Sequence, residues 1–322
     1  MREASRRRAR RRHRTVVILL TVVLAAIALL AFMTSRATGP SQLNGRRAGA
    51  PVTAAVRPAV VRTGYGVDLA AVRVTPRFKL PVRSGMLFDV RTGRVLWDRN
   101  PRQALPIASL TKMMTALVVV AHARLSSRVL VTPAAIHYSG SGVGLLPLGK
   151  NVPLETMLYG LMLPSGNDAA IALAQHVAGS EGRFIAMMNA RARQLGLRCT
   201  RFTTVSGIVD QGNFSCATDL AILAHAVLEQ PLLARIVATR NAALPFPIKG
   251  GKLYLHNNNP LLRLGYPGAD GVKTGYTAAA GRCLVATARR GNRWLGVVLL
   301  HSDDPPDQAR QLLDLGFATG RT

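Results

Sequence analysis

The residues of this sequence best suited to chemistry are a serine and a lysine three positions apart. Ser109 and Lys112 stand at the start of ASLTKMMTALVVV, an apolar stretch that predicts a helix over residues 109–123. Residues at i and i+3 share one face of a helix, so their functional groups can meet. A lysine with a lowered pKa can activate a serine as a nucleophile. Taken alone, however, the pair is more typical of a helix-capping serine beside a solvated lysine.

Two further motifs change that assessment. Ser165 and Asn167 belong to LPSGND, at the start of a predicted helix, and Lys273, Thr274 and Gly275 form KTG on a predicted strand. Each motif has a plainer explanation as a helix cap, a turn or a bulge. In the order SxxK, SxN and KTG, however, they form the set shared by penicillin-binding proteins and class A β-lactamases. Such an ordered set is not expected by chance.

The chain resembles the D-alanyl-D-alanine carboxypeptidases, the low-molecular-mass penicillin-binding proteins of peptidase family S11, over roughly three quarters of its length. The resemblance is carried by LFDVRTGRVLWDRN, PIASLTKMMTAL, LYGLMLPSGNDAAIALA, FIAMMNARARQLGL, LHNNNPLLRLGYPGADGVKTGYTAAAG and QLLDLGFA. It implies a serine DD-carboxypeptidase that removes the terminal D-Ala from peptidoglycan stem pentapeptides through an acyl-enzyme. It also implies that β-lactams inhibit the protein covalently and that no cofactor is needed.

The resemblance assigns the catalytic roles residue by residue. Ser109 is the expected nucleophile, Lys112 its general base, and Ser165 the relay of a proton to the leaving amine. Backbone N–H groups of Ser109 and Tyr276 are expected to form the oxyanion hole. The nearby charge of Lys273 would favour the neutral, basic form of Lys112.

The same resemblance assigns the substrate-binding residues. Asn167 is expected to bond the substrate amide and to hold Lys112 in place. Lys273 and Thr274 are expected to bind the terminal carboxylate, and Gly275 to let its strand lie close to the peptide. The stretch TVSGI, residues 204–208, departs from the Asn- or His-containing turn common in the family, which affects the expected loop and substrate choice.

Three other functions remain as alternatives. A class A-like β-lactamase needs a glutamate between SxN and KTG, and only Glu181 and Glu229 are available, both in predicted helices. A DD-endopeptidase that cleaves cross-links would use the same residues. A non-catalytic wall-binding protein is disfavoured because it would not require all of the polar motif residues.

The elements that must position these motifs predict an α+β fold of the β-lactamase/transpeptidase-like class. Strands come first, a block of helices follows, and strands return near the end, which is typical of an antiparallel sheet packed against a helical cluster. The expected strands cover residues 86–90, 94–98, 271–277, 282–290 and 293–301, and the expected helices cover residues 109–123, 154–163, 167–177, 181–195, 217–228 and 306–315.

The N-terminal region predicts membrane attachment. Residues 1–14 form a basic cytoplasmic tail, and residues 15–35 form an uncharged segment about 31 Å long as a helix, enough to span a bilayer. The arginines before it keep the N-terminus cytoplasmic and place the rest outside the cell. A cleaved signal peptide, which would give a secreted protein, is the alternative. Residues 36–82 are an expected linker, and residues 83–322 the peptidase domain.

Many family members carry their anchor in a C-terminal helix after a further β-rich domain. Here 47 residues follow Gly275, and the last predicted strands and helix use them. The N-terminal segment is therefore expected to replace the usual anchor.

The composition of the chain indicates which classes of binding partner are expected. The net charge is +27, but only 5% of the residues are aromatic, whereas nucleic-acid-binding modules usually interleave aromatic and basic side chains. We therefore expect no nucleic acid partner, and the charge suits an anionic membrane face or polymer.

The cysteines leave two possibilities open. Cys199 and Cys216 could pair and leave Cys283 free, or all three could be buried thiols. No CxxC pair or HExxH motif is present, so no metal site is predicted.

Overall fold

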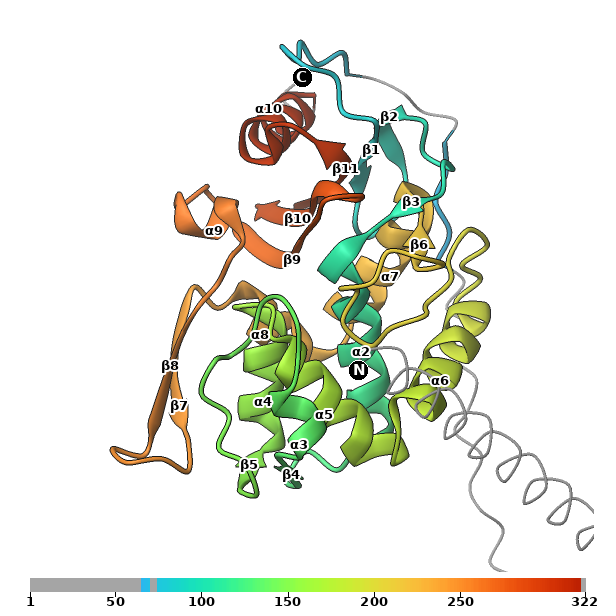
Figure 1. Ribbon diagram of the computed structural model, residues 1–322. Helices are drawn as coiled ribbons and strands as arrows, with labels where there is room; N and C mark the ends of the chain where they lie inside the picture. Colours follow the sequence, from blue (N-terminus) through green and yellow to red (C-terminus); the bar gives the residue numbers. More distant parts are fainter. Residues whose placement is uncertain (1–64, 70–73, 320–322) are drawn as a thin grey trace, which may run out of the picture. The chain divides into compact units, whose positions relative to one another are not determined.

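The computed structural model describes residues 65–69 and 74–319, and its centre is a five-stranded antiparallel sheet (Figure 1). The strand order is β2–β1–β11–β10–β9. The strands are β1 (Ser84–Asp89), β2 (Val95–Arg99), β9 (Ala269–Thr277), β10 (Gly281–Arg290) and β11 (Arg293–Ser302). The sheet thus joins the first two strands of the described chain to the last three, as strands separated by a block of helices predict.

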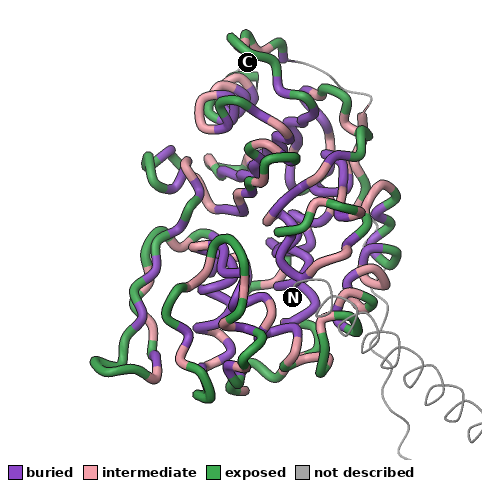
Figure 2. The backbone as a smooth tube through the Cα atoms, viewed as in Figure 1, coloured by how far each residue is buried: buried purple, intermediate pink, exposed green. Residues whose placement is uncertain are grey.

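Helices cover both faces of the sheet. Side chains alternate between the faces along β10: Val285 belongs to the core shared with the main helical cluster, and Leu284 to the core beneath α10 (Pro305–Ala318). Figure 2 shows the sheet and the helices next to it as largely buried. Because both faces are covered, the central strands read as nearly continuous apolar runs.

The helical cluster is built around a short 3-10 turn and the buried helix that follows it. The turn is η1 (Ala108–Thr111) and the helix is α2 (Lys112–His122). The other helices of the cluster are α3 (Pro133–Ile136), α4 (Leu154–Met162), α5 (Asn167–Ala178), α6 (Glu181–Gln194), α7 (Ala217–Leu228) and α8 (Pro231–Ala238). Helix α2 packs against α4, α5, α6 and α7, so the end that carries Ser109 and Lys112 is held from several sides.

The remaining elements are short. Two-stranded pairs join β3 (Leu105–Pro106) to β6 (Phe214–Ser215), β4 (Arg128–Leu130) to β5 (Asn151–Pro153), and β7 (Asn241–Pro245) to β8 (Lys252–His256). The β7–β8 hairpin leads into α9 (Pro260–Arg263), which contacts β9 (Figure 1). This connection places the hairpin and α9 just upstream of the KTG strand.

The predicted α+β class is confirmed, and the first predicted helix starts later than the sequence pattern indicates. Helix α7 has the predicted bounds, whereas the helix expected from Ser109 begins as an α-helix only at Lys112. Ser109 lies in the preceding 3-10 turn, and no side-chain capping bond is formed there. The hydroxyl of Ser109 is therefore not used as a helix cap.

Packing against the sheet begins upstream of residue 83, where the peptidase domain was predicted to start. Val74 and Val82 are buried, and Asp68 exchanges backbone hydrogen bonds with Gly93 and Val95. Tyr65 stacks on His225 with 3.7 Å between ring centroids. The described parts of the predicted linker thus contact the domain.

The predicted tail and membrane segment, residues 1–14 and 15–35, lie outside the described residues. Within the residues that the structure describes, no single helix is both long and apolar enough to cross a membrane. The bent pair α7 and α8 meets that requirement in length and composition only.

Candidate active site

Ser109 is positioned by a hydrogen-bonded turn. The Thr111 hydroxyl donates to the Ala108 carbonyl at 2.8 Å, and the side-chain amide of Asn213 donates to that hydroxyl at 2.9 Å. Gly207 has a φ of +80°, and a Cβ there would overlap the Ala108 carbonyl. The 3-10 turn is therefore fixed from both sides, with Ser109 half-buried at its centre.

The side chain of Lys112 is fully buried and has three polar neighbours. Its Nζ lies 2.9 Å from Ser109 Oγ, 2.6 Å from Asn167 Oδ1 and 2.8 Å from the carbonyl oxygen of Ser206. The structure thus brings together the serine and lysine that the sequence singled out. The third neighbour, the Ser206 carbonyl, was not predicted.

These neighbours direct the lone pair of a neutral Lys112. A neutral amine has two N–H groups and one lone pair, whereas carbonyl oxygens only accept. The oxygens of Asn167 and Ser206 take the two N–H groups, so the lone pair faces the Ser109 hydroxyl. The amide of Asn167 is oriented by its Nδ2, which donates to the Ser139 carbonyl at 2.5 Å.

Burial favours this neutral form. It lowers the pKa of Lys112 well below the ordinary 10.5, and the charge of Lys273 lowers it further, with Asp168 opposing the shift. The pKa of Lys273 is itself lowered to about 7 by burial. Of the two amines, the one beside the serine is therefore equipped to accept a proton.

A loop that packs on α5 supports the SxN motif. The Asp168 carboxylate accepts hydrogen bonds from the backbone N–H groups of Val143 and Gly144, at 2.8 and 3.2 Å. The backbone N–H of Asn167 donates to the Ser141 carbonyl at 2.8 Å. These bonds fix the start of α5 and, with it, the amide that contacts Lys112.

The KTG strand passes directly beside the serine turn. A Cβ at Gly275 would lie 2.9 Å from the Ile107 carbonyl oxygen and 3.1 Å from the Ser109 nitrogen, so the absence of a side chain permits the approach. Lys273 is buried, and its Nζ donates to the Thr274 carbonyl at 2.9 Å. Tyr276, which follows Gly275 on β9, is 68% exposed.

A cavity of about 430 Å³ lies between the serine turn and the KTG strand, and the buried side chains of Lys112, Asn167 and Lys273 are not part of its lining. Ser109, Ser165, Thr274, Gly275 and Tyr276 all line it. Ser165 has a φ of +71° and is 94% buried, and its hydroxyl has no hydrogen-bond partner among the described protein atoms. An unpartnered buried hydroxyl facing a cavity is suited to bonding a ligand.

The structure identifies several contributing residues that the motifs did not. Ser206 and Ser139 act through backbone carbonyls, which carry no side-chain signal, and Asn213 acts on the turn from over a hundred residues away. Only the departure at TVSGI, which contains Ser206, drew attention to one of them.

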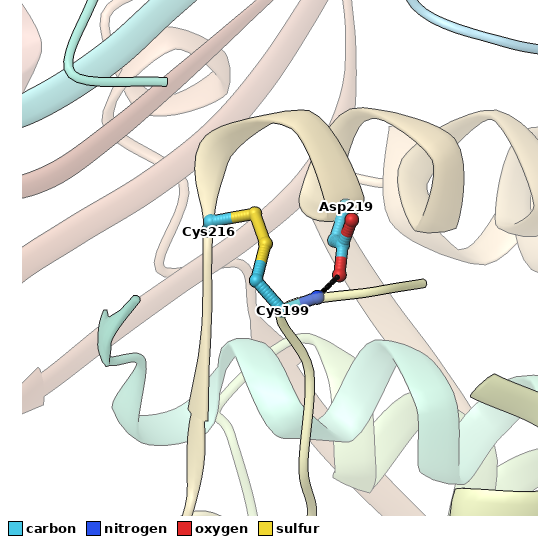
Figure 3. A group of neighbouring side chains, drawn as sticks. All are labelled: Cys199, Cys216 and Asp219. Atoms are coloured by element: carbon cyan, nitrogen blue, oxygen red, sulfur yellow. Dashed lines mark hydrogen bonds between the residues drawn. A yellow bond between two sulfur atoms is a disulfide. The ribbon is translucent and has the colours of Figure 1, made fainter. Parts of the chain in front are cut away.

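Two of the three cysteines form a structural group outside the cavity that contains Ser109, and the third lines that cavity. Cys199 and Cys216 form a disulfide, with Cα atoms 5.9 Å apart (Figure 3). Cys283 is a buried free thiol among the residues that line the cavity. Asp219 accepts hydrogen bonds from the Cys199 N–H at 2.8 Å and from the Thr200 hydroxyl at 2.7 Å. Although the two sulfurs and this carboxylate are close enough to hold a metal, a disulfide offers no thiolate ligand.

Comparison with known proteins identifies the family. The family model for D-alanyl-D-alanine carboxypeptidases, peptidase family S11, matches residues 71–304. The chain belongs to this family.

Individual proteins that are similar in sequence, and one that is similar in structure, support the same family. The chain is 37% identical to D-alanyl-D-alanine carboxypeptidase DacB2 of Mycobacterium tuberculosis, covering 74% of this chain and 83% of that protein. It is 35% identical to DacF of Bacillus subtilis, covering 74% of this chain and 63% of the relative's length. The solved Streptomyces K15 DD-transpeptidase superposes with a TM-score of 0.71 at 32% identity, covering 76% of this chain and 100% of that structure. The β-lactamase/transpeptidase-like fold is therefore confirmed.

Proposed function

We propose that this protein is a serine DD-carboxypeptidase that removes the terminal D-Ala from peptidoglycan stem pentapeptides. The observation that carries the proposal is the contact between Lys112 Nζ and Ser109 Oγ, 2.9 Å apart in a buried site that favours the neutral amine. Several relatives and one neighbouring structure bear the name D-alanyl-D-alanine carboxypeptidase, which also supports it.

The reaction follows from this geometry in two halves. The Lys112 amine takes the Ser109 proton as Oγ attacks the carbonyl carbon of the scissile peptide bond. Backbone N–H groups of Ser109 and Tyr276 stabilise the oxyanion. The C–N bond breaks, and Ser165 relays the proton to the departing amine of D-Ala. Water then hydrolyses the ester, which releases the shortened peptide and restores the Ser109 hydroxyl.

Substrate binding uses the KTG strand and Asn167. The terminal carboxylate lies against Thr274 and the charged form of Lys273, and the amide of Asn167 bonds the peptide while it holds Lys112. Gly275 lets the peptide backbone approach the strand. This assignment leaves the exposed end of β9 to the side chains of the stem peptide.

The β-lactamase alternative is less well supported. Glu181 begins α6 and Glu229 follows α7, and neither lines the cavity that contains Ser109. Neither carboxylate is therefore placed to activate a deacylating water. β-Lactams accordingly act as slowly released covalent inhibitors of Ser109.

We place the enzyme outside the cell, at the peptidoglycan. In this proposal residues 15–35 attach it to the membrane and residues 1–14 stay in the cytoplasm, or the segment is cleaved and the domain secreted. The described residues have 27 Lys and Arg against 14 Asp and Glu, an excess of 13, which suits an anionic envelope.

Labelling with fluorescent penicillin tests the proposal. The full chain should form a covalent adduct and release D-Ala from a pentapeptide, and Ser109→Ala should do neither. Ser127→Ala is the matched control, because Ser127 lies outside the cavity and bonds the Arg124 carbonyl. Absence of labelling in the wild type would refute the function, and adduct loss within seconds would favour the β-lactamase.

A further inference from the structure

A second cavity adjoins the one that contains Ser109. It measures about 840 Å³, and the two cavities share the lining residues Asn258, Pro260 and Pro306. Asn258 is fixed at this boundary: its N–H donates to the Leu163 carbonyl and its Nδ2 to the Pro164 carbonyl, both at 3.1 Å. A ligand that fills the first cavity can therefore extend past Asn258 into the second.

The lining of the second cavity is cationic. Arg240 precedes β7 and Arg263 ends α9, and no carboxylate side chain lines the cavity. The Nη2 of Arg240 donates to the Arg263 carbonyl at 2.8 Å, which holds the two arginines together. Neither guanidinium forms an ion pair within residues 65–69 and 74–319. Both charges therefore remain free for an anionic ligand, and arginine can bind a carboxylate in a bidentate manner.

The position of this cavity relative to the reaction indicates which part of a substrate would reach it. Under the proposed function, on which this inference rests, the residue that leaves lies between Ser165 and Thr274. Both line the first cavity together with Asn258, Pro260 and Pro306, which lead to the second. A leaving group of one alanine has no further residue that could reach the second cavity. A leaving peptide of two or more residues does.

We propose that the second cavity binds the leaving segment of substrates in which the scissile bond is followed by an acidic peptide, as in a cross-link between two stem peptides. Arg263 and Arg240 pair with a carboxylate of that segment. The bond broken is the same amide bond. The released amine, which takes the relayed proton, then belongs to the second stem peptide rather than to free alanine, and water again hydrolyses the ester. The enzyme is therefore also an endopeptidase for acidic cross-links.

Arg263→Ala provides the test, because the structure gives the Arg263 guanidinium no bond that the fold depends on. The full chain is assayed with a pentapeptide and with a purified cross-linked muropeptide dimer, with and without amidation of the leaving segment's carboxylates. We expect Arg263→Ala to lower kcat/KM for the acidic dimer by about tenfold, as for loss of one charge-assisted contact, with less than a twofold change for the pentapeptide. Arg263→Lys should keep part of the activity, and the amidated dimer should not respond. Arg183→Ala, an exposed arginine on α6, is the control.

The outcomes separate this inference from the function it rests on. If the wild type cleaves the pentapeptide but not the dimer, or if Arg263→Ala lowers both activities equally, the second-cavity proposal is wrong and the carboxypeptidase stands. If neither substrate is cleaved and no penicillin adduct forms, the proposed function fails and this inference fails with it.

Discussion

The Nζ of Lys112 lies 2.6 Å from Asn167 Oδ1, closer than the 2.9 Å that separates it from Ser109 Oγ. The SxN motif is thus bonded directly to the lysine of the SxxK motif. This contact couples the charge at position 167 to the proton affinity of the lysine.

Asn167→Asp should therefore shift the pH dependence of acylation. A carboxylate at this distance favours the protonated lysine and raises the pKa of Lys112. We expect the acid limb of the rate of penicillin labelling to move to higher pH, with activity partly recovered in alkali. Asn167→Ala removes the contact without adding charge and should slow labelling without that recovery. Identical pH profiles for the two variants would contradict the coupling.

Replacing Lys112 with arginine should abolish acylation although it keeps the positive charge. A guanidinium is not deprotonated in proteins, so it cannot take the Ser109 proton. Loss of a general base costs about 10²- to 10⁴-fold. The second-order rate constant for penicillin labelling measures this loss, and circular dichroism checks the fold. An arginine variant that labels at the wild-type rate would exclude Lys112 as the base.

The dependence of kcat/KM on pH should be bell-shaped for substrates with a free terminal carboxylate. Lys112 must be neutral, so activity falls as pH drops below its lowered pKa. Lys273 must be charged to bind the carboxylate, so activity also falls as pH rises through its pKa of about 7. A substrate whose terminal carboxylate is amidated should lose the alkaline limb. If the alkaline limb persists with the amidated substrate, deprotonation of Lys273 is not its cause.

Gly275→Ala should destabilise the protein and slow acylation together. The new Cβ would meet two backbone atoms, the Ile107 oxygen at 2.9 Å and the Ser109 nitrogen at 3.1 Å. Overpacking of this kind costs about 1–3 kcal/mol. The control is Gly182→Ala in α6, where a Cβ meets no atom within 4 Å and should stabilise the helix by about 0.5–1 kcal/mol. Thermal unfolding distinguishes the two, and equal melting temperatures would contradict the close approach.

Loss of the disulfide should reduce stability but spare the chemistry. Cys199 and Cys216 close a loop with a sequence separation of 17, for which chain entropy predicts about 3 kcal/mol. Neither residue lines the cavity that contains Ser109. Chemical unfolding of Cys199→Ala/Cys216→Ala should show a lower free energy of unfolding, with the initial rate of penicillin labelling unchanged in the native range. A large fall in that rate would link this pair to the site.

The sequence was most informative where function depends on side chains in fixed motifs. Ser109, Lys112, Ser165 and Asn167 could be predicted as site residues from the sequence because their types and order are distinctive. The fold gathers them at one cavity or beside it. The Ser206 carbonyl could not be identified in this way, because any residue supplies that atom and only the Gly207 turn places it.

The elements of the fold also divide into those that the sequence predicted and those that it did not. Long apolar patterns predicted β10, β11 and α7 closely, because the buried positions of these elements are occupied by apolar residues. The pairs β3–β6 and β4–β5 have two or three residues per strand, too few for a pattern, and form because the larger elements bring them together. The hairpin of β7 and β8, which leads to the arginines of the second cavity, was also missed.

The buried hydroxyl of Ser165 has a pharmacological consequence. This hydroxyl is buried and has no hydrogen-bond partner among the described protein atoms, and a buried polar group left unpaired costs about 1–3 kcal/mol. A reversible compound with an acceptor at that point would regain part of this energy without reacting with Ser109. Non-covalent inhibitors could therefore be built outward from Ser165, and such compounds would present no lactam ring for a resistance enzyme to open.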